Sequence, residues 1–166
     1  VFFRPILAIP HVIVGGIWGF FVAFLNLIQW IRILITGNRS EGLWIKQNRW
    51  LSYATRVKSY QTYLFDAFPA FGSTAKSEPV TYSFDFSKDA KRLSAFFRFL
   101  IAIPAFFVLF FMSIGAGFIL IAVWFALMIT GRFPAGMFAF MMKYRQFSAR
   151  LSAYLMYMTD QYPKSA

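Results

Sequence analysis

Residues 99–130 read FLIAIPAFFVLFFMSIGAGFILIAVWFALMIT and contain no charged side chain. Residues 5–36 form a second apolar run, interrupted by one charge at Arg32. Both runs exceed the roughly 18 residues that indicate a membrane-spanning segment. The composition agrees, because 59% of the chain is hydrophobic and 14% is charged, against about 25% charged residues in soluble domains. The sequence therefore predicts an integral membrane protein.

The composition also excludes several classes of chemistry. The chain has no cysteine, which excludes disulfides, iron–sulfur clusters and thiol nucleophiles, and it has only one histidine. Its 17 Lys and Arg against 6 Asp and Glu give a net charge of +11, which favours anionic partners. The basic residues interleave with aromatic residues and methionine, so we expect the membrane surface, and no nucleic acid, to be that partner.

The chain contains an internal duplication. Residues 1–72 align with residues 95–166 without a gap, and the aligned identities include arginine, aspartate, glycine, proline and tryptophan. An apolar composition alone does not bring such residues into register. We therefore divide the chain into repeat 1 (1–72), a polar linker (73–94) and repeat 2 (95–166).

Repeat 2 carries three motifs, which are FRFLIAIP at residues 97–104, WFALMITGRFP at 124–134 and AYLMYMTDQYP at 153–163. These motifs resemble those of the DUF4389 family of bacterial membrane proteins. The resemblance covers nearly the whole chain in two tandem copies, and it implies a lipid-bilayer protein of the bacterial inner membrane. Repeat 1 departs from the pattern at residues 38–40 and 65–69, where NRS and FDAFP replace the second half of the middle motif and the terminal motif.

Each apolar run is long for a single crossing. A straight helix over residues 99–130 would measure about 48 Å, against a hydrocarbon core of about 30 Å. We therefore expect a transmembrane helical hairpin in each repeat, turning near residues 113–117 and near Gly15, Gly16 and Gly19. One long tilted helix for each run is the alternative.

A basic, amphipathic segment follows each apolar run, at residues 42–68 and 136–162. We predict that each forms a helix lying in the membrane interface. Two hairpins would place both basic helices and the linker on one side, which the positive-inside bias makes cytoplasmic. Alternating polar and apolar residues over 80–86 predict one short strand in the linker. The expected fold is all-α, with two repeats of a hairpin and an interfacial helix.

Two features inside the apolar runs are candidate sites. For His11 we expect a structural or headgroup contact, with ligation of a haem or a pigment as the alternative. Asn26, Gln29 and Arg32 recur every three residues, and polar groups in hydrocarbon need partners, so this stripe should face protein. We expect a packing or subunit-contact role for it, with a transport path as the alternative, although Arg32 could also snorkel towards the interface.

The duplication preserves two arginine–aspartate combinations. We predict one ion pair between Arg4 and Asp66 and another between Arg98 and Asp160. A catalytic role for either aspartate is disfavoured, because the sequence places no histidine, cysteine or second carboxylate near it. The basic residues of the two amphipathic segments are candidates for anionic lipid headgroups, or for general membrane-surface charge. These residues are Lys46, Arg49, Arg56, Lys58, Lys143, Arg145 and Arg150.

These features together predict a non-catalytic integral membrane protein that serves as an accessory or scaffold subunit of a larger membrane complex and contacts anionic lipids. A small transporter of lipids or hydrophobic solutes is one alternative, because two repeats can frame a path across the membrane. A pigment-binding or haem-binding subunit that uses His11 is another.

Overall fold

The computed structural model describes residues 2–64 and 86–163. These residues form five helices: α1 (Arg4–Thr36), α2 (Glu41–Gln61), α3 (Arg92–Phe96), α4 (Arg98–Thr130) and α5 (Ala135–Leu155). The all-α prediction is confirmed for this part of the chain. The strand predicted over residues 80–86 lies outside the described residues except for Phe86, which is in no strand.

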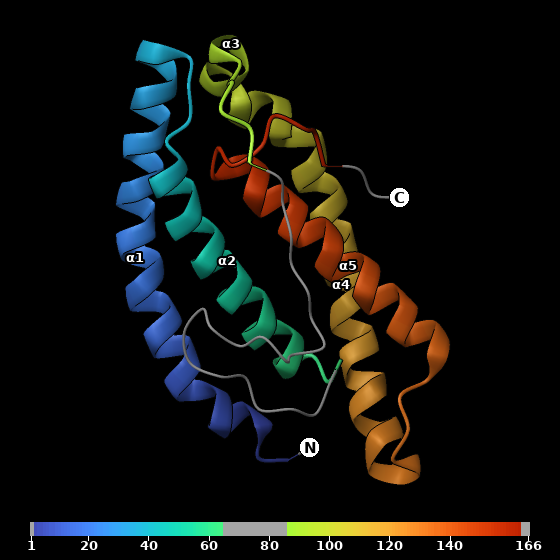
Figure 1. Cartoon of the computed structure of the whole chain (residues 1–166). Coiled ribbons are helices and arrows are strands. Elements are labelled where there is room, and N and C mark those ends of the chain that lie inside the picture. The colour runs from blue at the N-terminus through green and yellow to red at the C-terminus, as the bar shows by residue number, and fades with distance from the viewer. Residues whose placement is uncertain (1, 65–85, 164–166) are drawn as a thin grey trace.

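The two repeats are inverted relative to each other (Figure 1). α2 runs back along α1, α5 runs back along α4, and α2 contacts α5 at the boundary between the repeats. α1 and α4 therefore run in opposite directions, as do α2 and α5. The repeats are joined by the contact of α2 with α5 and by that of α1 with α3, whereas the described helices α1 and α4 do not pack directly on each other.

The inversion follows from where repeat 2 begins. The segment before α3 pairs with the turn between α1 and α2, where the N–H of Arg39 donates to the Lys88 carbonyl at 2.7 Å and that of Ala90 donates to the Gly37 carbonyl at 2.9 Å. The indole N–H of Trp30 also donates to the Ala95 carbonyl at 3.3 Å. Repeat 2 thus starts at the end of the molecule where α1 finishes.

The predicted hairpin within each apolar run is wrong. α1 and α4 are each one continuous helix of 33 residues, which corresponds to about 50 Å. The turn instead follows the whole run, where Gly37 and Gly131 end α1 and α4 with φ values of 73° and 67°. The predicted placement of both basic helices on one side of the membrane depends on hairpins, and it does not follow from continuous helices.

The glycines of α1 provide space for aromatic side chains of α2. A Cβ at Gly19 would lie 3.0 Å from Cζ2 of Trp50, and a Cβ at Gly15 would lie 3.5 Å from Cε1 of Tyr53. The Trp50 indole N–H donates to the Gly15 carbonyl at 3.1 Å. Glycine in a membrane helix permits either a turn or close helix packing, and here it permits packing.

The apolar stripe of α2 faces protein rather than lipid. Tyr53 is 0% exposed and Val57 is 6% exposed, and the Tyr53 ring lies 5.5 Å from that of Trp18 on α1. The basic helix therefore uses its apolar stripe to pack against the long helix of its own repeat. This differs from the interfacial helix predicted from sequence, in which the stripe would enter the lipid.

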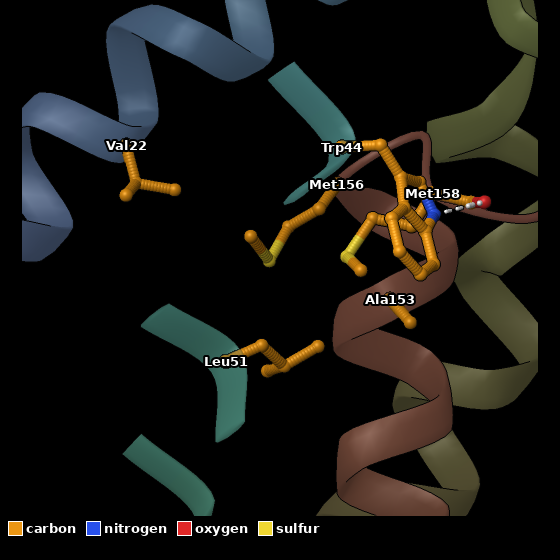
Figure 2. Close-up of a cluster of buried hydrophobic side chains, with 6 residues drawn as sticks. All are labelled: Val22, Trp44, Leu51, Ala153, Met156 and Met158. Carbon is orange, nitrogen blue, oxygen red and sulfur yellow. Dashed lines mark hydrogen bonds between the residues drawn. The ribbon is translucent and has the colours of Figure 1, made fainter. Parts of the chain in front are cut away.

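A buried core joins the two repeats (Figure 2). It is formed by six side chains from α1, α2, α5 and the segment after α5: Val22, Trp44, Leu51, Ala153, Met156 and Met158. The Trp44 indole N–H donates to the Met158 carbonyl at 3.2 Å, so this interface is held by a directed bond as well as by apolar packing.

The outer faces of α1 and α4 are apolar and exposed. Both helices are long and apolar enough to cross a membrane, and only 17% and 11% of their most apolar windows are buried in the protein. Phe21 on α1 is 61% exposed, and Phe111 on α4 is 67% exposed. Such low burial is unlike that of the central helix of a soluble protein.

Candidate functional site

Arg98, at the start of α4, forms an ion pair with Asp160 beyond the end of α5. Its Nη2 lies 2.7 Å from Oδ1 of Asp160, and its Nη1 donates to the carbonyls of Tyr154 and Thr159 at 2.6 and 3.0 Å. The Arg98 side chain is 1% exposed. This arginine therefore fastens the end of repeat 2 to its beginning.

A second arginine, Arg39, shares the same carboxylate oxygen. Its Nη2 lies 2.7 Å from Oδ1 of Asp160, its Nε donates to the Tyr157 carbonyl at 2.7 Å, and its Nη1 donates to the Asp89 carbonyl at 2.8 Å. Sequence analysis missed Arg39 because the aligned residue in repeat 2 is Phe133. The duplication therefore did not single it out.

Repeat 1 contains a matching arginine–tyrosine arrangement. The Arg4 guanidinium lies 4.9 Å from the ring centres of both Tyr60 and Tyr63. In repeat 2, the Arg98 guanidinium lies 4.4 and 4.8 Å from those of the aligned tyrosines, Tyr154 and Tyr157. The predicted partner of Arg4, Asp66, lies outside the described residues.

The second tyrosine of each arrangement has a left-handed backbone. Tyr63 and Tyr157 have φ values of 60° and 62°, a conformation that is uncommon for bulky residues. The N–H of Leu64 donates to the Ser59 carbonyl, and that of Met158 donates to the Ala153 carbonyl, at 3.2 and 3.1 Å. These bonds define the same helix-ending motif in both repeats, in which glycine is the usual residue.

The predicted polar stripe divides between the interior and the surface. Gln29 is 0% exposed, where its Oε1 accepts the Ser40 N–H at 3.1 Å. Asn26 Oδ1 accepts a hydrogen bond from the Gln47 amide. Arg32 is exposed. Asn26 and Gln29 thus hold α1 to α2 and to the turn between them, within the chain itself.

His11 is enclosed between α1 and α2. It is 1% exposed, and its Nδ1 lies 2.7 Å from the Tyr53 hydroxyl. This contact favours the structural interpretation of the imidazole over ligation of a cofactor.

The basic residues predicted to bind headgroups occupy three environments. Lys46 and Arg49 are exposed on α2, as are Lys143 and Arg150 on α5. Arg56 is 3% exposed and so belongs to the interior. The remaining two, Lys58 and Arg145, line one hollow where α2 meets α5.

At this hollow a cation of repeat 1, Lys58, meets a cation of repeat 2, Arg145. Burial, followed by repulsion from the Arg145 guanidinium, lowers the pKa of Lys58. The Lys58 side chain is nevertheless exposed on one side, where solvent screens part of this repulsion. Burial also lowers the pKa of Arg145, and the neighbouring Tyr144 opposes that effect.

Comparison with known proteins identifies a family and no individual relative. No curated protein and no solved structure matches the chain. The family described as "Domain of unknown function (DUF4389)" matches residues 1–73 and 92–166, which is consistent with two tandem copies and confirms the resemblance inferred from the motifs. Because these matches cover most of the chain, the protein belongs to the DUF4389 family.

Proposed function

We propose that this chain is a non-catalytic integral membrane protein that serves as an accessory or scaffold subunit of a larger membrane complex and contacts anionic lipids. Its location in this proposal is the bacterial inner membrane. The observation that carries the proposal is the contrast between the exposed apolar outer faces of α1 and α4 and the bonded polar interior.

The outer faces support the membrane part of the proposal. Large apolar side chains are exposed along nearly the full length of α1 and α4, including Ile6, Phe24, Phe107 and Ile129. Soluble monomers rarely expose apolar patches larger than a few hundred Å². Lipid tails, together with apolar helices of other subunits, would cover such faces.

The interior supports a structural rather than a catalytic role. Its buried polar side chains bond mainly to backbone carbonyls, as Arg39, Arg98 and Trp44 do. Gln47 likewise donates to the Met156 carbonyl at 2.9 Å. Bonds of this kind fix one tertiary structure, whereas acid–base catalysis uses titratable groups gathered in a cleft that admits substrate.

The exposed cations support the lipid part of the proposal. Lys46, Arg49, Lys143 and Arg150 lie on the exposed sides of α2 and α5. Each basic group near an anionic leaflet contributes about 1 kcal/mol to membrane attraction. This attraction is general, and it requires no defined binding site.

Purification of the tagged full chain from its own membranes in mild detergent tests the proposal. Mass spectrometry should find a membrane protein in stoichiometric amount and anionic lipids enriched over the bulk membrane. The double variant Phe20→Leu, Phe24→Leu keeps the outer face of α1 apolar but removes a ring pair with centroids 5.2 Å apart. Recovery of a partner that packs on these rings should fall. A partner-free monomer without enriched anionic lipid would contradict the proposal.

The inverted arrangement favours a transporter as a second candidate. Many secondary transporters consist of two inverted repeats with the substrate site between them. Against this, a large part of the boundary is filled by the core around Trp44, and the hollow between α2 and α5 has a volume of only about 30 Å³. A larger hollow of about 330 Å³ lies beside Trp30 and Phe99, and its lining is mostly apolar. Flux of lipid or solute into liposomes that contain only this chain would favour transport over the scaffold role.

A further inference from the structure

A small hollow lies between α2 and α5, at the boundary of the two repeats. Its lining consists of Trp50, Leu51, Ala54, Thr55, Lys58, Arg145, Ser148, Ala149 and Ser152. In the alignment of the repeats, Leu51 matches Arg145, and Lys58 matches Ser152. The hollow is therefore built by equivalent positions of both repeats, but each repeat contributes its cation from a different position.

Neither cation has an acidic partner among residues 2–64 and 86–163. Among the residues that the structure describes, no ion pair joins Lys58 or Arg145 to a carboxylate. The one hydrogen bond of Arg145 runs from Nε to the Thr62 hydroxyl at 3.4 Å. Two cations that repel each other and lack a carboxylate favour an anion between them.

The rest of the lining has the size and polarity for a small oxyanion. Ser148 and Ser152 place two hydroxyl groups at the hollow, and a hydroxyl group can donate to an oxyanion. A volume of about 30 Å³ is room for roughly two water molecules at 10–15 Å³ each. A phosphate group can therefore enter only in part, with its remaining oxygens on the open side where Lys58 is exposed, and the hollow is too small for a glycerol backbone or an acyl chain.

We propose that the hollow between α2 and α5 binds one phosphate group, held by the Lys58 ammonium, the Arg145 guanidinium and the hydroxyls of Ser148 and Ser152. The phosphate belongs either to an anionic lipid headgroup or to a free ion. The proposal rests on the proposed function in one respect, since it selects two of the candidate lipid-binding cations as a defined site. Lys46, Arg49 and Lys143 then contribute only general surface charge.

The duplication supplies a variant that keeps the fold. Lys58→Ser and Arg145→Leu each introduce the residue that the other repeat carries at the matching position. The double variant therefore removes both cations with side chains that the same helix–helix contact already accommodates. Its matched control is Lys46→Ser, Lys143→Leu, which removes two exposed cations outside the hollow.

Calorimetric titration of the full chain in non-ionic detergent measures binding of three probes: dihexanoyl phosphatidic acid, dihexanoyl phosphatidylcholine and inorganic phosphate. The double variant should bind phosphatidic acid at least about tenfold more weakly, because two charge-assisted contacts are lost. The control should stay within about twofold. Inorganic phosphate bound as tightly as phosphatidic acid would make the free ion the occupant, whereas a clear preference for phosphatidic acid would make it a lipid headgroup.

Equal weakening in the double variant and its control would overturn the inference, because general charge would then explain the binding. Absence of binding of all three probes by the unchanged chain would overturn it as well.

A second measurement does not depend on affinity. In ¹³C-dimethylated protein, phosphate should raise the pKa of Lys58, and an unchanged Lys58 signal at saturating phosphate would exclude contact. The proposed function is tested separately, since anionic lipid that still co-purifies with the double variant would support it even where the phosphate site fails.

Discussion

Arg98 Nη2 and Asp160 Oδ1 lie 2.7 Å apart, and they join the first turn of α4 to the segment after α5. Arg39 lies at the same distance from this oxygen, so one carboxylate serves two guanidinium groups. The side chains of Arg39 and Arg98 are 0% and 1% exposed. The carboxylate thus compensates charge that water does not reach.

Asp160→Asn should strongly destabilise the protein. Removing one partner of a buried ion pair leaves uncompensated charge and costs about 3–5 kcal/mol, and the 19% exposure of the Asp160 side chain places the effect near the lower end. Unfolding in a mild detergent titrated with dodecyl sulfate measures the change. Asp89→Asn is the control, because Asp89 contributes its backbone carbonyl to Arg39. Equal stability of the two variants would contradict the role of the shared carboxylate.

Tyr157 should make the protein less stable at alkaline pH. Burial raises the pKa of its phenol above the ordinary 10.0, although the Arg98 guanidinium opposes this. A raised pKa means that the contribution to stability is present below the unfolded-state value and is lost as pH rises through the folded-state value. Tyr157→Phe should therefore flatten the fall in melting temperature above about pH 10. Tyr162→Phe, at a tyrosine that is 40% exposed, should change that fall less.

Two neighbouring glycines of α1 should respond oppositely to alanine. At Gly19 a Cβ would lie 3.0–3.2 Å from three atoms of the Trp50 ring, whereas nothing lies within 4 Å at Gly16. Gly19→Ala should lower the free energy of unfolding by about 1–3 kcal/mol through overpacking. Gly16→Ala should raise it by about 0.5–1 kcal/mol, because glycine weakens a helix interior. Dodecyl sulfate unfolding compares the two, and destabilisation of similar size in both would remove Trp50 packing as the cause.

The duplication and the apolar runs predicted much of this molecule. They gave the all-α class, the presence of two tandem copies and the combination of Arg98 with Asp160. Repetition is a strong signal of structural importance, because it identifies the few polar residues that both copies keep. Composition alone does not distinguish these residues from the others. Arg39 had no such signal, since Phe133 takes its place in repeat 2.

The hairpins failed for a physical reason. The apolar runs are longer than the bilayer is thick, and the glycines at 15, 16 and 19 fit a turn as well as they fit close packing. The sequence does not show whether a glycine serves a turn or the close approach of another helix. Here the approach of Trp50 shows that it serves packing, and Trp50 is distant in the sequence. The inversion of the repeats was also hidden, because it depends on backbone hydrogen bonds from Arg39 to Lys88 and from Ala90 to Gly37, which are distant in the sequence.

Cysteine labelling separates a continuous α1 from a hairpin. The chain has no cysteine, and added Cβ atoms meet nothing within 4 Å at Gly16, Gly117 and Gly42. In opened membranes that expose both sides, Gly16→Cys and Gly117→Cys should resist a water-soluble maleimide, because a continuous apolar helix keeps these positions in hydrocarbon. Gly42→Cys, on the exposed side of the first turn of α2, should react readily. Reaction at Gly16→Cys as fast as at Gly42→Cys would contradict the placement of this part of α1 in the hydrocarbon.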